Sequence, residues 1–242
     1  MRYLVISDIH SNLAALQTVL SDADDFDEIL CLGDLVGYGP NPNECVSRVR
    51  EERNTCLAGN HDWAALGKLS LSSFNTDARI ANAWTQRQLG STARAFLNSL
   101  PTNRVVGDFT LAHASPREPV WEYITHATVA RANLSHFSTP FCLVGHTHIP
   151  VIFRYDEDRD EMETVRPTYG EPFSLEPDRM IINPGSVGQP RDGNPEASYA
   201  ILDADEMTWT YYRVEYPVEI TQERMRAKDL PQRLVERLAA GR

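Results

Sequence analysis

The sequence lacks the long apolar runs and flexible linkers that characterise membrane-spanning and multidomain proteins. Because no run of 18 apolar residues occurs, no segment is expected to cross a bilayer as a helix. Because no Gly/Ser-rich or low-complexity linker occurs, the 242 residues are predicted to form one domain, 1–242, with a helical tail at about 217–242. The chain begins with an apolar core strand, Tyr3–Ile6, instead of a signal peptide, which predicts a cytoplasmic protein.

Positive charge is also in short supply. The chain has 23 Lys and Arg against 34 Asp and Glu, a formal net charge of −11, and its basic residues form no cluster. Stable binding to long nucleic acid or to an anionic membrane surface is therefore not expected. A small anionic substrate remains compatible with this charge, because bound metal ions can reverse the local field.

Cysteine is sparse, and its spacing matches no metal finger. The four cysteines are Cys31, Cys45, Cys56 and Cys142, and three of them fall inside predicted core strands. They are therefore interpreted as small buried thiols, and no disulfide framework is expected in a chain of this length.

Five short apolar runs are present, and each leads directly into polar residues. Short runs of this kind are typical of buried strands in a parallel sheet, and open α/β sheets place their ligand sites at the carboxyl ends of such strands. Five of the seven histidines follow these runs, which random scatter seldom produces. The runs are 3–6, 29–32, 55–58, 109–112 and 141–144, and the residues that follow them are Asp8, His10, Asp34, Asn60, His61, His113, His146 and His148.

This set of side chains suits divalent cations. Mn²⁺, Fe²⁺ and Zn²⁺ accept mixed oxygen and imidazole ligands. If the backbone stays extended past Gly145, His146 and His148 point to the same side and can ligate two ions about 3.5–4 Å apart. Asp34 is the best candidate for a bridging carboxylate, because it follows Gly33 at a strand end, where close backbone approach costs little.

Between and after these runs, the periodicity of apolar residues outlines further elements. Helices are predicted at 13–23, 42–52, 64–100 with a break at Gly90, and 125–137, and a pair of strands at 105–113. The segments 151–155, 179–182, 198–202 and 209–216 are predicted to form an antiparallel second sheet. Asp229 is predicted to cap a last helix near the end of the sequence. The residues of that helix do not decide whether it covers the domain or contacts a partner subunit.

Taken in order, the polar residues resemble the motifs of the calcineurin-like metallophosphoesterase superfamily. The motifs are Asp8-x-His10, Gly33-Asp34, Gly59-Asn60-His61-Asp62, His113 and Gly145-His146-x-His148, and the segment 183–188 resembles the bacterial members. The resemblance implies an α/β fold, a four-layer α/β/β/α sandwich of two mixed β-sheets flanked by helices. It also implies two divalent metal ions, one held by Asp8, His10, Asp34 and His148, the other by Asp34, Asn60, His113 and His146.

The resemblance further implies hydrolysis of a phosphoester by attack of a metal-bridging hydroxide. It gives His61 the role of general acid or of a contact to the phosphoryl oxygen. An imidazole, with an ordinary pKa near 6.5, suits the first role.

At three positions the sequence differs from the motifs of related enzymes, and these differences narrow the range of expected substrates. Tyr38 stands where the protein Ser/Thr phosphatases and symmetrical diadenosine tetraphosphatases carry a phosphate-binding Arg. Gly37 and Ala58 stand where the protein phosphatases have an orienting Asp and a second Arg. Arg191 is the candidate to replace the missing phosphate-binding Arg. The alternative interpretation is that Arg191 is a solvent-facing residue in a turn. Tyr38 either contacts the substrate or closes its own turn.

The favoured interpretation is a phosphoesterase acting on small phosphomonoesters, phosphodiesters or nucleotide polyphosphates. A Ser/Thr protein phosphatase is the alternative within the superfamily, weakened by the missing arginines. A catalytically silent scaffold of the same fold is disfavoured, because all eight site positions carry competent side chains.

Overall fold

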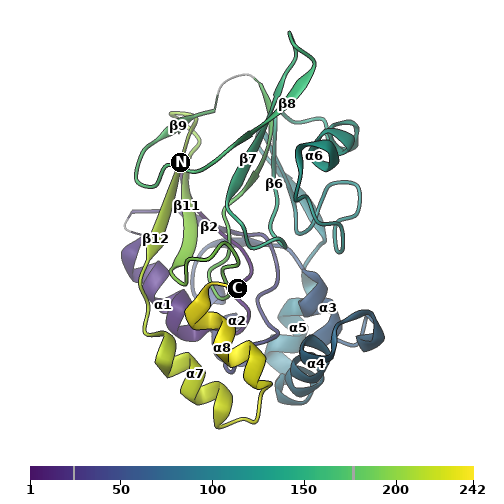
Figure 1. Ribbon diagram of the computed structural model, residues 1–242, viewed down its shortest axis with the longest axis vertical. Coiled ribbons are helices and arrows are strands. Elements are labelled where there is room, and N and C mark those ends of the chain that lie inside the picture. The colour runs from purple at the N-terminus through teal and green to yellow at the C-terminus, as the bar shows by residue number, and fades with distance from the viewer. Residues whose placement is uncertain (24, 176–177) are drawn as a thin grey trace.

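Two six-stranded β-sheets face each other in the computed structural model, which describes residues 1–23, 25–175 and 178–242 (Figure 1). In the first sheet, the order is β3-β2-β1-β11-β12-β9, with β1 to β3 parallel and the other pairs antiparallel. The strands are β1 (Arg2–Ile6), β2 (Glu28–Cys31), β3 (Asn54–Cys56), β9 (Phe173–Ser174), β11 (Ala197–Asp203) and β12 (Thr208–Val214).

The second sheet repeats this plan. Its order is β4-β5-β6-β10-β7-β8, with β5, β6 and β10 parallel and the other pairs antiparallel. The strands are β4 (Asn103–Val106), β5 (Phe109–Ala112), β6 (Phe141–Leu143), β7 (Val151–Asp156), β8 (Glu161–Val165) and β10 (Arg179–Asn183). The predicted strand pair at 105–113 is confirmed as the β4–β5 hairpin.

The predicted separate antiparallel sheet after residue 150 is wrong. Its four segments form strands, but β11 and β12 join the first sheet through β1, and β7 and β10 join the second sheet through β6. The reason is burial: Ala197 to Leu202 are buried on both faces of β11, which requires a central position in a covered sheet. Local alternation identifies a strand but does not identify its partner.

Helices cover the outer face of each sheet, and the four-layer sandwich is confirmed. Along β1, Leu4 and Ile6 pack against helices, whereas Val5 packs into the layer between the sheets. The first sheet is covered by α1 (Leu13–Asp22), α2 (Pro42–Arg50) and α5 (Ser91–Ser99), and the second by α6 (Ala127–Asn133). The apolar layer between the sheets includes Trp209, which is fully buried.

The predicted helical region 64–100 consists of several shorter helices. These are α3 (Asn60–Ala65), α4 (Thr76–Gln88) and α5, with a 3₁₀ turn at Leu71–Ser73, and a second 3₁₀ turn at Leu134–His136 follows α6. The break predicted at Gly90 is confirmed, because Gly90 precedes α5 at its N-cap position. Helix α2 ends at Arg50, two residues before the predicted end.

Two helices close the described chain, α7 (Val218–Arg226) and α8 (Gln232–Ala240), which lie together at one end of the molecule (Figure 1). Helix α8 buries Leu234, Val235 and Leu238 against Tyr38 and residues of α4 and α7, so it covers the protein's own core. The predicted cap by Asp229 is wrong: Pro231 takes the N-cap position, and Asp229 lies at a positive φ in the turn that ends α7. Within the described residues, no helix combines the length and the apolar character that crossing a membrane requires.

Asn12 connects three elements near the site. Its side chain accepts hydrogen bonds from the Ala15 N–H at the start of α1 and from the Thr221 hydroxyl on α7. It donates to the carbonyl of Gly188 and to the hydroxyl of Tyr216, and it is 1% exposed. This side chain therefore caps a helix and also satisfies buried polar groups of other segments.

We expect Asn12→Ala to lower the free energy of unfolding by about 2–4 kcal/mol, because it removes a cap and leaves buried partners without a hydrogen bond. The matched control is Asn75→Ala, whose exposed side chain only caps α4 through the Ala78 N–H and should cost about 1 kcal/mol. Urea unfolding of the metal-free proteins measures both values. Equal losses would contradict the role of Asn12 as a connector.

Candidate metal centre

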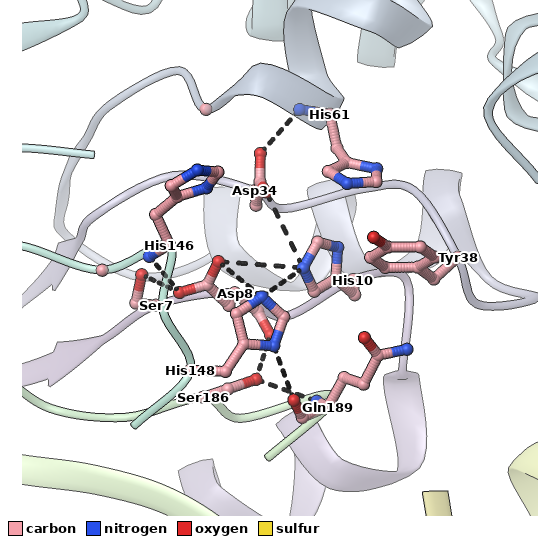
Figure 2. A network of polar contacts seen from close by, with 12 residues as sticks. Ser7, Asp8, His10, Asp34, Tyr38, His61, His146, His148, Ser186 and Gln189 are labelled. Atoms are coloured by element: carbon pink, nitrogen blue, oxygen red, sulfur yellow. Dashed lines mark hydrogen bonds and ion pairs between the residues drawn. The ribbon is translucent and has the colours of Figure 1, made fainter. Parts of the chain in front are cut away.

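The carboxyl ends of five parallel strands, three from the first sheet and two from the second, deliver polar side chains to one buried place. Figure 2 shows several of these side chains pointing toward one another from separate segments. None of the eight predicted residues is more than 4% exposed, although all are polar or ionisable. They are Asp8 and His10 after β1, Asp34 after β2, Asn60 and His61 after β3, His113 after β5, and His146 and His148 after β6.

Seven of these residues form two adjoining groups. In the first, His148 Nε2 lies 3.2 Å from Asp8 Oδ1 and 3.1 Å from His10 Nε2. In the second, the ligand atoms of Asp34, His113 and His146 lie within 4.8 Å of one another, and Asn60 Oδ1 lies 3.1 Å from His113 Nε2. Asp34 Oδ2 lies between them, 3.7 Å from His10 Nε2 and 3.5 Å from His113 Nε2. The ligand atoms of His10, Asp34 and His61 also lie within 4.8 Å of one another, so His61 adjoins both groups.

Backbone carbonyls fix the tautomer of three histidines. The Nδ1 atoms of His10, His113 and His148 lie 3.2, 2.9 and 2.6 Å from the carbonyl oxygens of residues 36, 32 and 189. A carbonyl oxygen can only accept, so each Nδ1 carries the proton and each neutral ring presents the lone pair of Nε2 to the centre. Metal-binding histidines are oriented in this way by the partner of their other nitrogen.

The carboxylates of Asp8 and Asp34 are also oriented by hydrogen bonds to one of their two oxygens. Asp8 Oδ2 accepts hydrogen bonds from the Ser7 hydroxyl and the His146 N–H, which leaves Oδ1 toward the first group. Asp34 Oδ1 accepts the His61 N–H at 2.8 Å, which leaves Oδ2 toward both groups. Within the described part of the chain, Asp34 Oδ2 and His146 Nε2 have no hydrogen-bond partner.

Acceptor atoms therefore face one another with no proton between them. The Nε2 atoms of His10 and His148, each with a lone pair, lie 3.1 Å apart. The acceptor atoms His113 Nε2 and Asn60 Oδ1 also lie 3.1 Å apart. Such an arrangement is repulsive by itself, and divalent cations with nitrogen and oxygen ligands resolve the repulsion. The residues present fit two such ions.

Burial controls the protonation of the centre. It lowers the pKa of His148 to about 4, with the charge of Arg191 acting in the same direction, so this ring is neutral at neutral pH. Burial also raises the pKa of Asp34, and the carboxylates of Asp62 and Asp8 raise it further. Asp62 accepts a hydrogen bond from the Gly59 N–H at the start of α3, and burial raises its pKa to about 6.

The backbone reaches this geometry through left-handed conformations. Asp8, His10, Asp34, His146 and His148 all have φ between 49° and 65°. The expectation of an extended backbone past Gly145 is therefore wrong: β6 ends at Leu143, and both histidines lie in tight turns. Each such residue costs about 1–3 kcal/mol of backbone strain, which clusters at functional sites. Gly33 has φ of +102°, and a Cβ there would lie 2.8 Å from His113 Nδ1, in agreement with its predicted close approach.

His61 lies beside the two groups and is oriented by a residue that the sequence analysis missed. Its Nδ1 lies 3.1 Å from Oδ1 of Asn82, a fully buried residue on α4. A Cβ at Gly37 would lie 2.6 Å from His61 Nδ1, so no side chain fits at that position. The orienting group of the protein phosphatases is thus absent from Gly37, and an amide replaces it. Burial lowers the pKa of His61 to about 3.

Tyr38 and Arg191 form one side of the centre. The Tyr38 ring centroid lies 4.6 Å from that of His10 and 4.2 Å from that of His61. Arg191 Nη2 donates to Gln189 Oε1 at 2.9 Å, and its guanidinium carbon lies 5.8 Å from the centroid of Tyr38. Both predicted substrate contacts therefore lie next to the predicted ligands, while the remaining histidines, His126 and His136, are exposed and outside the centre.

The fold is that of a metallophosphoesterase. The structure matches that of a metallophosphoesterase from Sphaerobacter thermophilus with a TM-score of 0.92 and 51% identity, covering 100% of this chain and 99% of the other. A family model described as the calcineurin-like phosphoesterase superfamily domain matches residues 1–207, so the chain belongs to this superfamily.

Two further relatives match along almost their whole length. An uncharacterised protein of Methanocaldococcus jannaschii is 40% identical over 245 residues, 98% of this chain and 97% of the relative. A hypothetical protein from Pyrococcus horikoshii OT3 shares the fold, with a TM-score of 0.81 at 19% identity over 100% of this chain and 98% of the other.

The pKa shifts predict that the metal-free protein loses stability in acid. Burial lowers the pKa of all five histidines of the centre, so below the unfolded value near 6.5 the unfolded chain binds protons that the folded chain does not. Asp34 and Asp62 have raised pKa values, so their protonation stabilises the folded state in acid, but these two groups are outnumbered by the five histidines. The loss begins near pH 6.5 and continues through about pH 4 and about pH 3, the pKa values of His148 and His61.

We expect the free energy of unfolding to fall by at least about 2 kcal/mol between pH 7 and pH 5, measured by urea unfolding after chelation of metals. His126→Gln is the control and should show the same dependence on pH, because that histidine is exposed. A stability that is constant or rises between these pH values would contradict the neutral, buried state of the histidines.

Proposed function

We propose that the protein is a phosphoesterase that uses two divalent metal ions to hydrolyse small phosphomonoesters, phosphodiesters or nucleotide polyphosphates. The observation that carries this proposal is the set of buried acceptor atoms that face one another without protons. The superfamily and the Sphaerobacter relative support the same reaction class. Mn²⁺, Fe²⁺ and Zn²⁺ are the candidate ions because the ligands combine imidazole with oxygen.

Each ligand has a role that follows from its position. Asp8, His10 and His148 would hold one ion, and Asn60, His113 and His146 the other, with Asp34 between them. When bound, such a pair of ions supplies an activated water molecule and neutralises charge on the phosphoryl group. Asn60 contributes a neutral oxygen, which limits the negative charge of the centre. The carbonyls at residues 32, 36 and 189 keep three rings in the tautomer that binding requires.

His61 would deliver the proton to the leaving oxygen or contact the phosphoryl oxygen. With its pKa near 3, the ring is neutral in the metal-free protein, and Nδ1–H donates to Asn82. A bound phosphate brings negative charge to the ring and raises its pKa, so that Nε2 takes up a proton when substrate arrives. Asn82 accepts from Nδ1 in both protonation states and thereby keeps Nε2 directed at the substrate.

The site favours small substrates over phosphoproteins. The orienting carboxylate of the protein phosphatases has no room at Gly37, and Tyr38 replaces their phosphate-binding arginine. Arg191, next to Tyr38, is the proposed phosphate contact in its place. With a net charge of −11, neither long nucleic acid nor an anionic membrane is proposed as a partner. All four cysteines are free, which suits the reducing cytoplasm, the proposed location.

The central test combines metal content with turnover. We expect protein supplemented with Mn, Fe or Zn to bind two ions per chain and to hydrolyse p-nitrophenyl phosphate or its bis-ester. Because Asp34 faces both groups, Asp34→Asn should reduce the metal content and lower kcat/KM by about a hundredfold or more. His126→Asn, on the exposed surface, is the matched control and should retain both properties.

The two measurements distinguish the alternatives. Two bound ions without turnover of any phosphoester would favour a silent scaffold of the same fold. Preferred turnover of phosphopeptides over small phosphoesters would favour the protein phosphatase alternative. Fewer than two ions under all supplements would overturn the proposed centre itself.

The role of Asn82 has its own test. We expect Asn82→Ala to lower kcat by about tenfold, because His61 loses the acceptor that fixes its ring, while KM changes little. Asn82→Asp should raise the pKa of His61 through the added negative charge and, because His61 must be protonated to donate, move the alkaline limb of the kcat profile to higher pH.

Thr85→Val is the control for Asn82, because Thr85 is buried on the same face of α4 and its hydroxyl bonds only the carbonyl of Ala81. A loss of kcat in Thr85→Val equal to that in Asn82→Ala, or an unmoved profile in Asn82→Asp, would assign Asn82 a merely structural role.

A further inference from the structure

A cavity of about 750 Å³ lies beside the metal centre and is bounded on its far side by α8. Two of its lining residues also contact the centre. Tyr38 packs against His10 and His61, and the ring centroid of Tyr123 lies 3.9 Å from that of His146. The cavity and the centre therefore share the rings of Tyr38 and Tyr123 as a common wall.

The cavity is rich in arginine, in contrast to the acidic surface of the protein. Arg191 lines it next to the centre, and Arg233 and Arg237 line it from α8, together with Arg242. Among residues 1–23, 25–175 and 178–242, no ion pair is formed by Arg191, Arg233 or Arg237. Arg237 Nε donates to the backbone oxygen of Arg242, and within the described residues no Asp or Glu forms an ion pair with the three converging cationic side chains.

The acidic residues of the lining do not balance this charge. Only Asp77 and Glu236 line the cavity among the acidic residues described, and Glu236 already accepts a hydrogen bond from Gln232. Burial, followed by the charge of Arg191, lowers the pKa of Arg237 to about 10, because this guanidinium is partly desolvated and lies near other cations. An anion in the cavity would relieve this repulsion.

Arg191 links the cavity to the reacting groups. Its positive charge acts on His61 and His148 on one side and on Arg237 on the other. It also donates to Gln189, the residue whose carbonyl accepts from His148. A phosphate at the centre and an anion among the arginines of α8 would therefore flank Arg191.

We propose that this cavity, the arginine pocket, binds a second phosphate group, so that the preferred substrates are small molecules with two or more phosphates. The inference rests on the proposed function and names the substrate class of the same site. Arg191, Arg233 and Arg237 supply guanidinium donors in the geometry that suits phosphate oxygens. The packing side chains of α8, Leu234, Val235 and Leu238, hold Arg233 and Arg237 at the pocket.

The test uses inorganic tripolyphosphate and orthophosphate as probes, titrated into the Mn-loaded protein by calorimetry. Orthophosphate carries a single phosphate group and occupies one position at a time, whereas tripolyphosphate can span the centre and the arginine pocket. We expect tripolyphosphate to bind at least tenfold more tightly. In the double variant Arg233→Gln/Arg237→Gln, this preference should fall by about tenfold to a hundredfold, because two charge-assisted contacts are lost.

The matched control is Arg224→Gln/Arg226→Gln, which removes the same charge from exposed positions on α7, outside the pocket. It should keep the preference for tripolyphosphate. An equal loss of the preference for tripolyphosphate in both double variants would show that only the net charge of the protein matters, and would overturn the proposal. Equal binding of both anions by the wild-type protein would also overturn it.

Hydrolysis of p-nitrophenyl phosphate or its bis-ester by the wild-type protein distinguishes a failure of the proposed function from a failure of the pocket. Absence of this turnover with a retained, arginine-dependent preference for tripolyphosphate would refute the proposed function and leave the pocket in place. Turnover without that preference would refute the pocket alone.

Discussion

The structure depends on one electrostatic constraint: buried acceptor atoms are held face to face with no proton between them. The rings of His10 and His148 each direct Nδ1–H outward to a carbonyl, which leaves two Nε2 lone pairs 3.1 Å apart in the interior. Asp34 repeats the arrangement by giving one oxygen to the His61 N–H and leaving the other without a hydrogen bond among the described residues. A cation stabilises this arrangement and an empty interior does not, so metal binding and folding stability are linked.

Two sheets are needed to build this constraint. The first sheet contributes the carboxyl ends of three parallel strands and the second sheet those of two, and the tight turns that follow aim the side chains inward. The turns force residues such as Asp8 and His146 into left-handed conformations, which cost energy on their own. The apolar layers on both faces of each sheet offset this cost, because they fix the strand ends independently of the site.

The sequence predicted the position of the site better than its detailed geometry. Apolar runs ending in Asp, Asn and His identified the five strand ends that reach the site, because burial and sidedness are local properties of a strand. Partner choice is not local, which is why β11 and β12 were grouped with β7 and β10 in one sheet. Left-handed turns at His146 and His148 left no signal in residue type, since histidine does not demand them. Asn82 did leave one: with Ala78, Ala81 and Thr85 it forms the buried stripe of α4, where an amide needs a buried partner.

The charge distribution explains how an acidic protein can act on anions. A net charge of −11 repels extended polyanions at a distance, but Arg191, together with the cations proposed for the centre, would create a local positive field behind the rings of Tyr38 and Tyr123. Only a compact anion can enter that field without bringing a long charged chain against the surface. In the proposed function, arrival of this charge would raise the pKa of His61, which burial holds near 3, and would make the neutral ring a proton donor. Substrate binding and acid catalysis would then be coupled through one electrostatic field, and selectivity for small anions would follow from the same burial that protects the proposed ligands.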